Sequence, residues 1–158
     1  MLFRSDRVDL RWERVERSGR APDCRGHFDR AIARAVAAAP VVAEYLVPLL
    51  APAGEAILYR GQWGADDQRT LERAAMQLRA AVEPVEAIEL PSERGVRHAV
   101  RLRPLAACPA AYPRPVGVAL KSPLGSEGQP HGRQLSRPAD AAPARRRAAR
   151  ADGAADRG

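Results

Sequence analysis

The residues best placed for chemistry are two arginines that follow runs of strand-forming residues. Arg34 ends the run FDRAIAR, and Arg60 and Gly61 follow the apolar run AILY. Open α/β sheets bind ligands outside the carboxyl ends of their strands, so a positive group there favours an anionic ligand, and Gly61 would allow close backbone approach. The alternatives are a surface ion pair of Arg34 with Glu16 or Asp29, and ordinary turn chemistry at Arg60.

Other reactive side chains are few and scattered. Cys24 and Cys108 are the only cysteines, and they form neither a CxxC pair nor a cluster with metal-ligand spacing. We therefore expect no metal site, and unpaired thiols of this kind favour a cytoplasmic location. The histidines, His27, His98 and His131, lie where structural or solvated roles are expected, so no catalytic acid or base is nominated.

Three stretches predict strands that would carry these residues. Val8–Trp12 alternates apolar and charged residues, the period of a strand with one buried face. A polar loop over Arg14–Gly26 separates it from the short strand Phe28–Ala33, and Ala56–Tyr59 is the third predicted strand.

Two stretches predict helices between and after these strands. From Pro40 the apolar residues recur at helical spacing, and Pro48 should kink or end that helix before a stop at Pro52–Gly54. Asp66–Val82 predicts the second helix, with acidic residues in its first turn and Pro84 at its end.

The last two predicted strands, Val85–Leu90 and Arg97–Arg103, are joined by a short turn and should pair antiparallel. Helix-linked strands followed by a hairpin indicate a mostly parallel sheet with an antiparallel last strand. That arrangement is the methyltransferase variant of the doubly wound α/β fold.

Charge and composition limit the kinds of partner that the chain can bind. The chain has 158 residues, a formal net charge of +7 and a pI of about 10.6, which favours polyanions such as RNA. The N-terminus lacks a signal-peptide core, and the most apolar run, residues 35–54, contains Glu44 and three prolines, so no membrane span is expected. Residues 125–158, with Arg145–Arg147, predict a disordered basic tail after a domain spanning residues 1–124.

Six segments in order resemble the small-subunit (16S) ribosomal RNA methyltransferase G family, also called glucose-inhibited division protein B. They are ERVE at 13–16, FDRAIARAV at 28–36, LVPLLAPAG at 46–54, YRGQ at 59–62, GVRHAVRL at 95–102 and YPRPVGVALKSPL at 112–124. Ala119 stands where the family often has proline. The resemblance covers residues 6–124 and corresponds to the C-terminal half of the family's domain only.

The resemblance implies methyl transfer from S-adenosylmethionine to N7 of a guanine in 16S rRNA, within a Rossmann-like methyltransferase fold and as part of ribosome biogenesis. It implies cofactor contacts for Val15, Glu16 and Arg34. Candidate RNA contacts are Arg60, Arg97 and Arg114, and the implied partner of a monomeric protein is 16S rRNA or the small ribosomal subunit. Guanine N7 carries a free lone pair, so such an enzyme must align the reacting atoms and exclude water rather than supply a base.

The glycine-rich turn and first strands that complete the family's cofactor pocket have no counterpart here, since no GxG occurs in the chain. Without them the parallel sheet should have an unpaired edge and an uncovered face. We therefore expect a partial methyltransferase fold with poor independent stability and little cofactor affinity. The alternative function is a non-catalytic, basic RNA-binding remnant.

Overall fold

A computed structural model describes residues 8–92 and 94–126 as one mixed α/β sheet with helices. The strands are β1 (Phe28–Arg34), β2 (Leu50–Arg60), β3 (Ala80–Val82), β4 (Glu86–Glu89) and β5 (Val96–Pro104). The helices are α1 (Val15–Ser18), α2 (Ala39–Leu46), the 3₁₀ turn η1 (Val47–Leu49), α3 (Ala65–Gln77) and α4 (Val118–Lys121).

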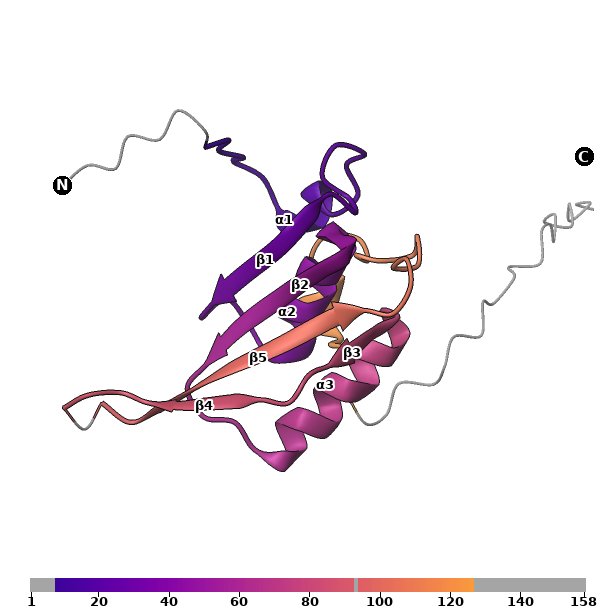
Figure 1. Cartoon of the computed structure of the whole chain (residues 1–158). Coiled ribbons are helices and arrows are strands. Elements are labelled where there is room, and N and C mark those ends of the chain that lie inside the picture. Colours follow the sequence, from indigo (N-terminus) through magenta and orange to yellow (C-terminus); the bar gives the residue numbers. More distant parts are fainter. Residues whose placement is uncertain (1–7, 93, 127–158) are drawn as a thin grey trace, which may run out of the picture.

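The sheet has the strand order β1-β2-β5-β3, with β4 also paired to β5 (Figure 1). β1 and β2 are parallel, with Arg34 opposite Tyr59, whereas β5 is antiparallel to β2, β3 and β4. β3 and β4 pair with successive parts of β5 and so share one edge of the sheet. This agrees with the partial Rossmann-like fold and reversed final strand expected from the sequence.

The hydrophobic core lies between the sheet and the helices α2 and α3, which pack on the same face (Figure 1). Leu58 of β2 and Val100 and Leu102 of β5 point into it, against Leu71 of α3, and all four are at most 1% exposed. Every residue of α2 is buried. This helix meets α3, the sheet and the C-terminal segment around α4.

The opposite face of the sheet carries no helix among the described residues, and β1 forms its outer edge (Figure 1). Ile32 of β1 is 59% exposed and Tyr59 of β2 is 42% exposed on this side. Beside them Glu55 pairs with Arg30, at 3.1 Å, and with Arg103, at 3.7 Å. The uncovered face and unpaired edge expected from the sequence are both present in the described structure.

The expected helix after β1 is confirmed. Pro40 occupies its first turn, where a proline lacks only an N–H that would be unpaired anyway, and α2 ends at Leu46 before Pro48. The antiparallel pair of β4 and β5 is confirmed as well, with Ile88 opposite Arg97.

The predicted strand Val8–Trp12 is wrong for this structure, in which the segment is irregular and exposed. A strand needs a neighbour to pair with, and the described chain offers none at this point. The polar loop predicted over Arg14–Gly26 contains the short helix α1, in which Glu16 is only 1% exposed.

Two element boundaries differ from the predicted ones. β2 begins at Leu50 and runs through residues 52–54, where the sequence predicted a stop. Gly54 lets the strand lie close to β1, since a Cβ there would be only 2.7 Å from the Phe28 carbonyl oxygen. The helix predicted over Asp66–Val82 ends at Gln77. Arg79, with a φ of 58°, reverses the chain into β3, well before Pro84.

The C-terminal segment crosses the outside of α2 and reaches α3. Gly125 is buried, and its carbonyl oxygen accepts a hydrogen bond from Nε of Arg73. Gly125, where the predicted tail begins, is thus held against α3, and the rest of that prediction, residues 127–158, lies outside the described part. No helix within residues 8–92 and 94–126 is long and apolar enough to cross a membrane.

Candidate functional site

A hollow of about 640 Å³ opens at the carboxyl ends of β1 and β2. Its walls come from these strand ends and from the β4–β5 hairpin. The lining residues are Arg34, Ala35, Tyr59, Arg60, Gly61, Ile88, Leu90, Arg97, His98 and Ala99. Three of the predicted site residues, Arg34, Arg60 and Arg97, therefore meet in one place.

Strand register explains this convergence. Arg34 and Arg60 are the last residues of two parallel neighbours, so both reach the same edge of the sheet. β5 runs in the opposite direction and brings its amino-terminal half to that edge, where His98 pairs with Arg60. Ala35 follows β1 with a φ of 54°, which turns the chain away from the sheet.

Two side-chain hydrogen bonds hold the rim of the hollow. Nη1 of Arg60 donates to the Ala37 carbonyl oxygen at 2.6 Å, and Nδ1 of His98 lies 2.7 Å from the Gly61 carbonyl oxygen. Because a carbonyl only accepts, Nδ1 of His98 carries the proton in this contact. Both loops that follow the parallel strands are thereby tied to the sheet.

The hollow is positively charged and partly apolar. Within the described residues no carboxylate pairs with Arg34, Arg60 or Arg97, whereas Ile88 and Tyr59 contribute exposed apolar surface. Gly61 is not required by packing, since a Cβ there would meet nothing within 4 Å. Such a mixture suits a ligand with both an anionic part and a flat or apolar part.

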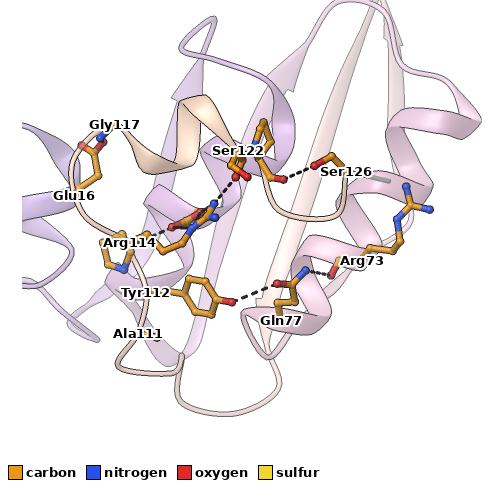
Figure 2. Close-up of polar contacts among 12 residues, drawn as sticks. Glu16, Arg73, Gln77, Ala111, Tyr112, Arg114, Gly117, Ser122 and Ser126 are labelled. Atoms are coloured by element: carbon orange, nitrogen blue, oxygen red, sulfur yellow. Dashed lines mark hydrogen bonds and ion pairs between the residues drawn. The ribbon is translucent and has the colours of Figure 1, made fainter. Parts of the chain in front are cut away.

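Val15 and Glu16 are not among the residues that line this hollow. The Glu16 carboxylate is buried and accepts a hydrogen bond from Nη2 of Arg14, at 3.0 Å. It also accepts one from the Gly117 amide, at 3.1 Å (Figure 2). Burial raises the pKa of Glu16, but these donors outweigh it and lower that pKa to about 2. The group is therefore an ionised anchor for the C-terminal segment.

Arg114 is similarly engaged. Its Nη2 lies 2.6 Å from Oε2 of Glu44, its Nε and backbone amide also donate to that carboxylate, and Nη2 reaches the Ser122 carbonyl oxygen at 2.8 Å (Figure 2). Glu44 is fully buried in α2. With its guanidinium held in this pair, Arg114 has no geometric support as a phosphate contact, and that role stays a prediction.

Several residues of this architecture had no signal in the sequence. Glu44 and Arg114 are 70 positions apart, and Arg25 bonds the carbonyl oxygens of Cys108 and Tyr112 across a similar separation. The sequence marked Tyr59 and His98 only as residues of predicted strands. The strand register places them on opposite faces of the sheet, and both line the hollow.

Among the described residues no group of three or more His, Cys, Asp or Glu side chains could hold a metal ion. Cys24 and Cys108 are free thiols, and burial raises the pKa of Cys108.

Comparison with known proteins gives a consistent result. A family model described as "rRNA small subunit methyltransferase G" matches residues 3–96. A protein of Synechococcus sp. (strain RCC307), named ribosomal RNA small subunit methyltransferase G, is 60% identical over 120 residues, 76% of this chain and 51% of that protein. Its namesake in Parasynechococcus marenigrum (strain WH8102) is 57% identical over 121 residues, 77% of this chain and 49% of the relative. The chain spans about half the length of the curated relatives it matches.

Proposed function

The chain belongs to the rRNA small subunit methyltransferase G family, and from this premise we propose that it serves methyl transfer from S-adenosylmethionine to N7 of a guanine in 16S rRNA. The observation that carries the proposal is the convergence of Arg34, Arg60 and Arg97 on one hollow at the carboxyl ends of the parallel strands. Ligands of open α/β sheets bind at this edge.

The residues present fit S-adenosylmethionine only in part. Arg34 borders the hollow and has no carboxylate partner in the described structure, so it is free to hold an anionic group of the cofactor. Both carboxylate oxygens of Glu16 accept hydrogen bonds from Arg14, and cofactor contacts for Val15 and Glu16 stay predictions.

RNA is the proposed macromolecular partner, with a cytoplasmic location and a monomeric state. Arg60 and Arg97 lie on the rim of the hollow, where a guanidinium can bind phosphate, and Tyr59 offers a ring on which a base can stack. Arg60 and Arg97 position the RNA, and N7 of guanine needs no base.

The test joins this chain, at its amino end, to the part of the Synechococcus relative that lies outside the match. We expect the joined polypeptide to transfer labelled methyl groups to unmodified 16S rRNA, and Arg34→Ala to lower that rate at least about tenfold, as loss of a charged contact does. Arg69→Ala, on the outer side of α3 with a 60% exposed side chain, is the control and should leave the rate unchanged. Equal rates for the two variants would remove Arg34 from the site.

The second candidate is RNA binding without catalysis. It is favoured by the incomplete cofactor site combined with arginines on the rim of the hollow that have no carboxylate partner within the described residues. Saturable, salt-dependent binding of a 16S rRNA fragment by the chain alone would support it, with no heat on titration with S-adenosylmethionine. Arg97→Ala should then reduce the salt slope by about 1, and Arg69→Ala should not.

A further inference from the structure

A second hollow, of about 440 Å³, adjoins the candidate site, and we call it the outer hollow. Its walls come from the turn that follows β2, with Gly61, Gln62 and Trp63, and from the start of β5, with Val96, Arg97 and His98. Gly61, Arg97 and His98 also line the hollow of the candidate site. The contact between Nδ1 of His98 and the Gly61 carbonyl oxygen therefore belongs to a wall that the two hollows share.

Trp63 gives the outer hollow an aromatic surface of fixed orientation. Its Nε1 donates a hydrogen bond to Oε1 of Gln68 in α3, at 3.1 Å, and its ring packs partly against the hydrophobic core. Nε2 of Gln68 in turn donates to a carboxylate oxygen of Glu72, at 2.8 Å, so α3 holds both partners of the ring. A tryptophan ring held in this way is a platform on which a nucleobase can stack, whatever its identity.

The polar groups of the outer hollow suit a phosphate and the edge of a base. Nη1 of Arg97 donates to the Val96 carbonyl oxygen, at 3.0 Å, and the other N–H groups of this guanidinium remain for a ligand. His98 uses Nδ1 for its contact with Gly61, so in the neutral ring Nε2 is left as an acceptor. Among the described residues that line the outer hollow none is acidic, although Glu89 lies opposite Val96 in the β4–β5 pair. These groups favour a ligand with an anionic part and a flat ring.

We propose that the outer hollow binds the nucleotide next to the target guanine in the RNA strand. The base of this neighbour stacks on Trp63, and Arg97, on the shared wall, binds the phosphate that joins the two nucleotides. A volume of about 440 Å³ lies within the range of about 300–1,000 Å³ that is usual for small-molecule sites. The inference rests on the proposed function, because it places the target guanine in the hollow of the candidate site.

Single-stranded RNA explains the arrangement of the two hollows better than a polyanion without bases does. Unpaired bases of RNA are recognised by splaying them apart and stacking them on aromatic rings. Tyr59 supplies such a ring in the hollow of the candidate site and Trp63 supplies one in the outer hollow, with Arg97 between them. A polyanion without bases would use only Arg97 and leave both rings uncovered.

Fluorescence tests the stacking directly, because Trp12 and Trp63 are the only tryptophans of the chain. In Trp12→Phe only Trp63 emits, and a short single-stranded RNA that contains guanine should quench this emission saturably. In Trp63→Phe only Trp12 emits, and the same RNA should leave its emission unchanged. Heparin, which carries anionic groups without bases, should quench neither tryptophan. Quenching of Trp12 alone, or equal quenching of Trp63 by heparin, would overturn the proposal.

Affinity supplies a second measurement with a matched pair of variants. Trp63→Leu keeps an apolar side chain but removes the ring, whereas Trp63→Phe keeps a ring on which a base can stack. Loss of one stacked base weakens binding about 5- to 150-fold, so we expect a loss in this range for Trp63→Leu and less than about threefold for Trp63→Phe. Fluorescence anisotropy of labelled RNA measures both, and equal affinities would overturn the proposal.

Steady-state kinetics of the joined polypeptide distinguish binding from a purely structural role. Trp63→Leu should raise KM for RNA at least about fivefold and change kcat less than about twofold, because stacking is equally strong in the bound substrate and in the transition state. KM for S-adenosylmethionine should stay the same. A fall in kcat with an unchanged KM for RNA would overturn the proposal.

The outcomes also separate this inference from the proposed function. Methyl transfer that is lowered by Arg34→Ala, but with the same KM for RNA in Trp63→Leu and Trp63→Phe, would support the proposed function and overturn the inference. Quenching of Trp63 by RNA, without methyl transfer by the joined polypeptide, would support the nucleotide site and contradict the proposed activity.

Discussion

The two faces of the sheet differ in how their charged residues are used. On the side covered by helices, Glu44 of α2 and Glu16 of α1 are almost fully buried. Each accepts hydrogen bonds from an arginine guanidinium, Arg114 for Glu44 and Arg14 for Glu16, and from a backbone amide of the C-terminal segment. On the open face Glu55 and Glu86 pair with arginines on neighbouring strands and have no such amide partner among the described residues. Buried pairs are costly to break, whereas exposed pairs contribute little.

Removing the Glu44 carboxylate should produce the largest effect. Glu44→Ala leaves Arg114 without its partner in a largely buried site, and breaking such a pair costs about 3–5 kcal/mol. Urea unfolding followed by circular dichroism measures the loss. Glu86→Ala, which removes a half-exposed partner of Arg101 at 2.9 Å, is the matched control and should cost less than about 1 kcal/mol. Similar losses in the two variants would contradict the difference between the faces.

A second test uses exposed and buried apolar residues of neighbouring strands. Leu58→Ala opens a cavity in the core and should cost about 2–5 kcal/mol, since Leu58 is 1% exposed. Ile32→Ala, at a position 59% exposed, should stay within about 0.5 kcal/mol in this chain alone. Once the open face is covered, the cost of Ile32→Ala should rise. A large loss in the isolated chain would mean that something already covers this face.

The sequence predicted the covered part of the fold better than the open part. β1, α2 and the β4–β5 pair followed from local patterns, because their residues contact neighbours that this chain supplies. Val8–Trp12 has an equally clear strand pattern but stays irregular, because a strand forms only when another strand accepts its hydrogen bonds. The prediction therefore failed where the described chain offers no partner.

The candidate site was predictable to a similar extent. The meeting of Arg34 and Arg60 followed from their place at the ends of parallel strands. The Glu44–Arg114 pair did not, since its partners are 70 positions apart and nothing local marks either one. The early end of α3 was missed because Arg79 adopts a positive φ that no residue preference suggested.

Acid should weaken the covered face through Glu16. The folded pKa of Glu16, about 2, lies below its ordinary value of 4.5. Its contribution is therefore complete above about pH 4.5 and is lost as the pH falls towards 2. In that window the unfolded chain binds up to one more proton, so stability should fall by roughly 1.4 kcal/mol per pH unit. Urea unfolding between pH 5 and 2.5 gives this slope.

The control for the acid prediction is Glu16→Gln, which cannot titrate. This variant should be less stable than the parent chain at neutral pH, because an amide is a weaker acceptor for Arg14 and the Gly117 amide. Its stability should then fall less steeply than that of the parent below pH 4.5. Parallel acid limbs for the two proteins would show that Glu16 is not the titrating anchor.

The smallest effect is expected on the open face, where Arg103 lies 3.7 Å from Glu55 and its side chain is 54% exposed. Arg103→Ala should cost below about 1 kcal/mol at low salt, and the cost should shrink further at 1 M salt because ions screen exposed pairs. The cost of Glu44→Ala should be nearly independent of salt, since its pair with Arg114 is buried away from the ions. Urea unfolding of both variants at 20 mM and 1 M sodium chloride tests this difference directly. A salt-independent loss for Arg103→Ala would mean that the pairs of Glu55 with Arg30 and Arg103 are shielded from solvent, and hence that the open face is covered in the isolated chain.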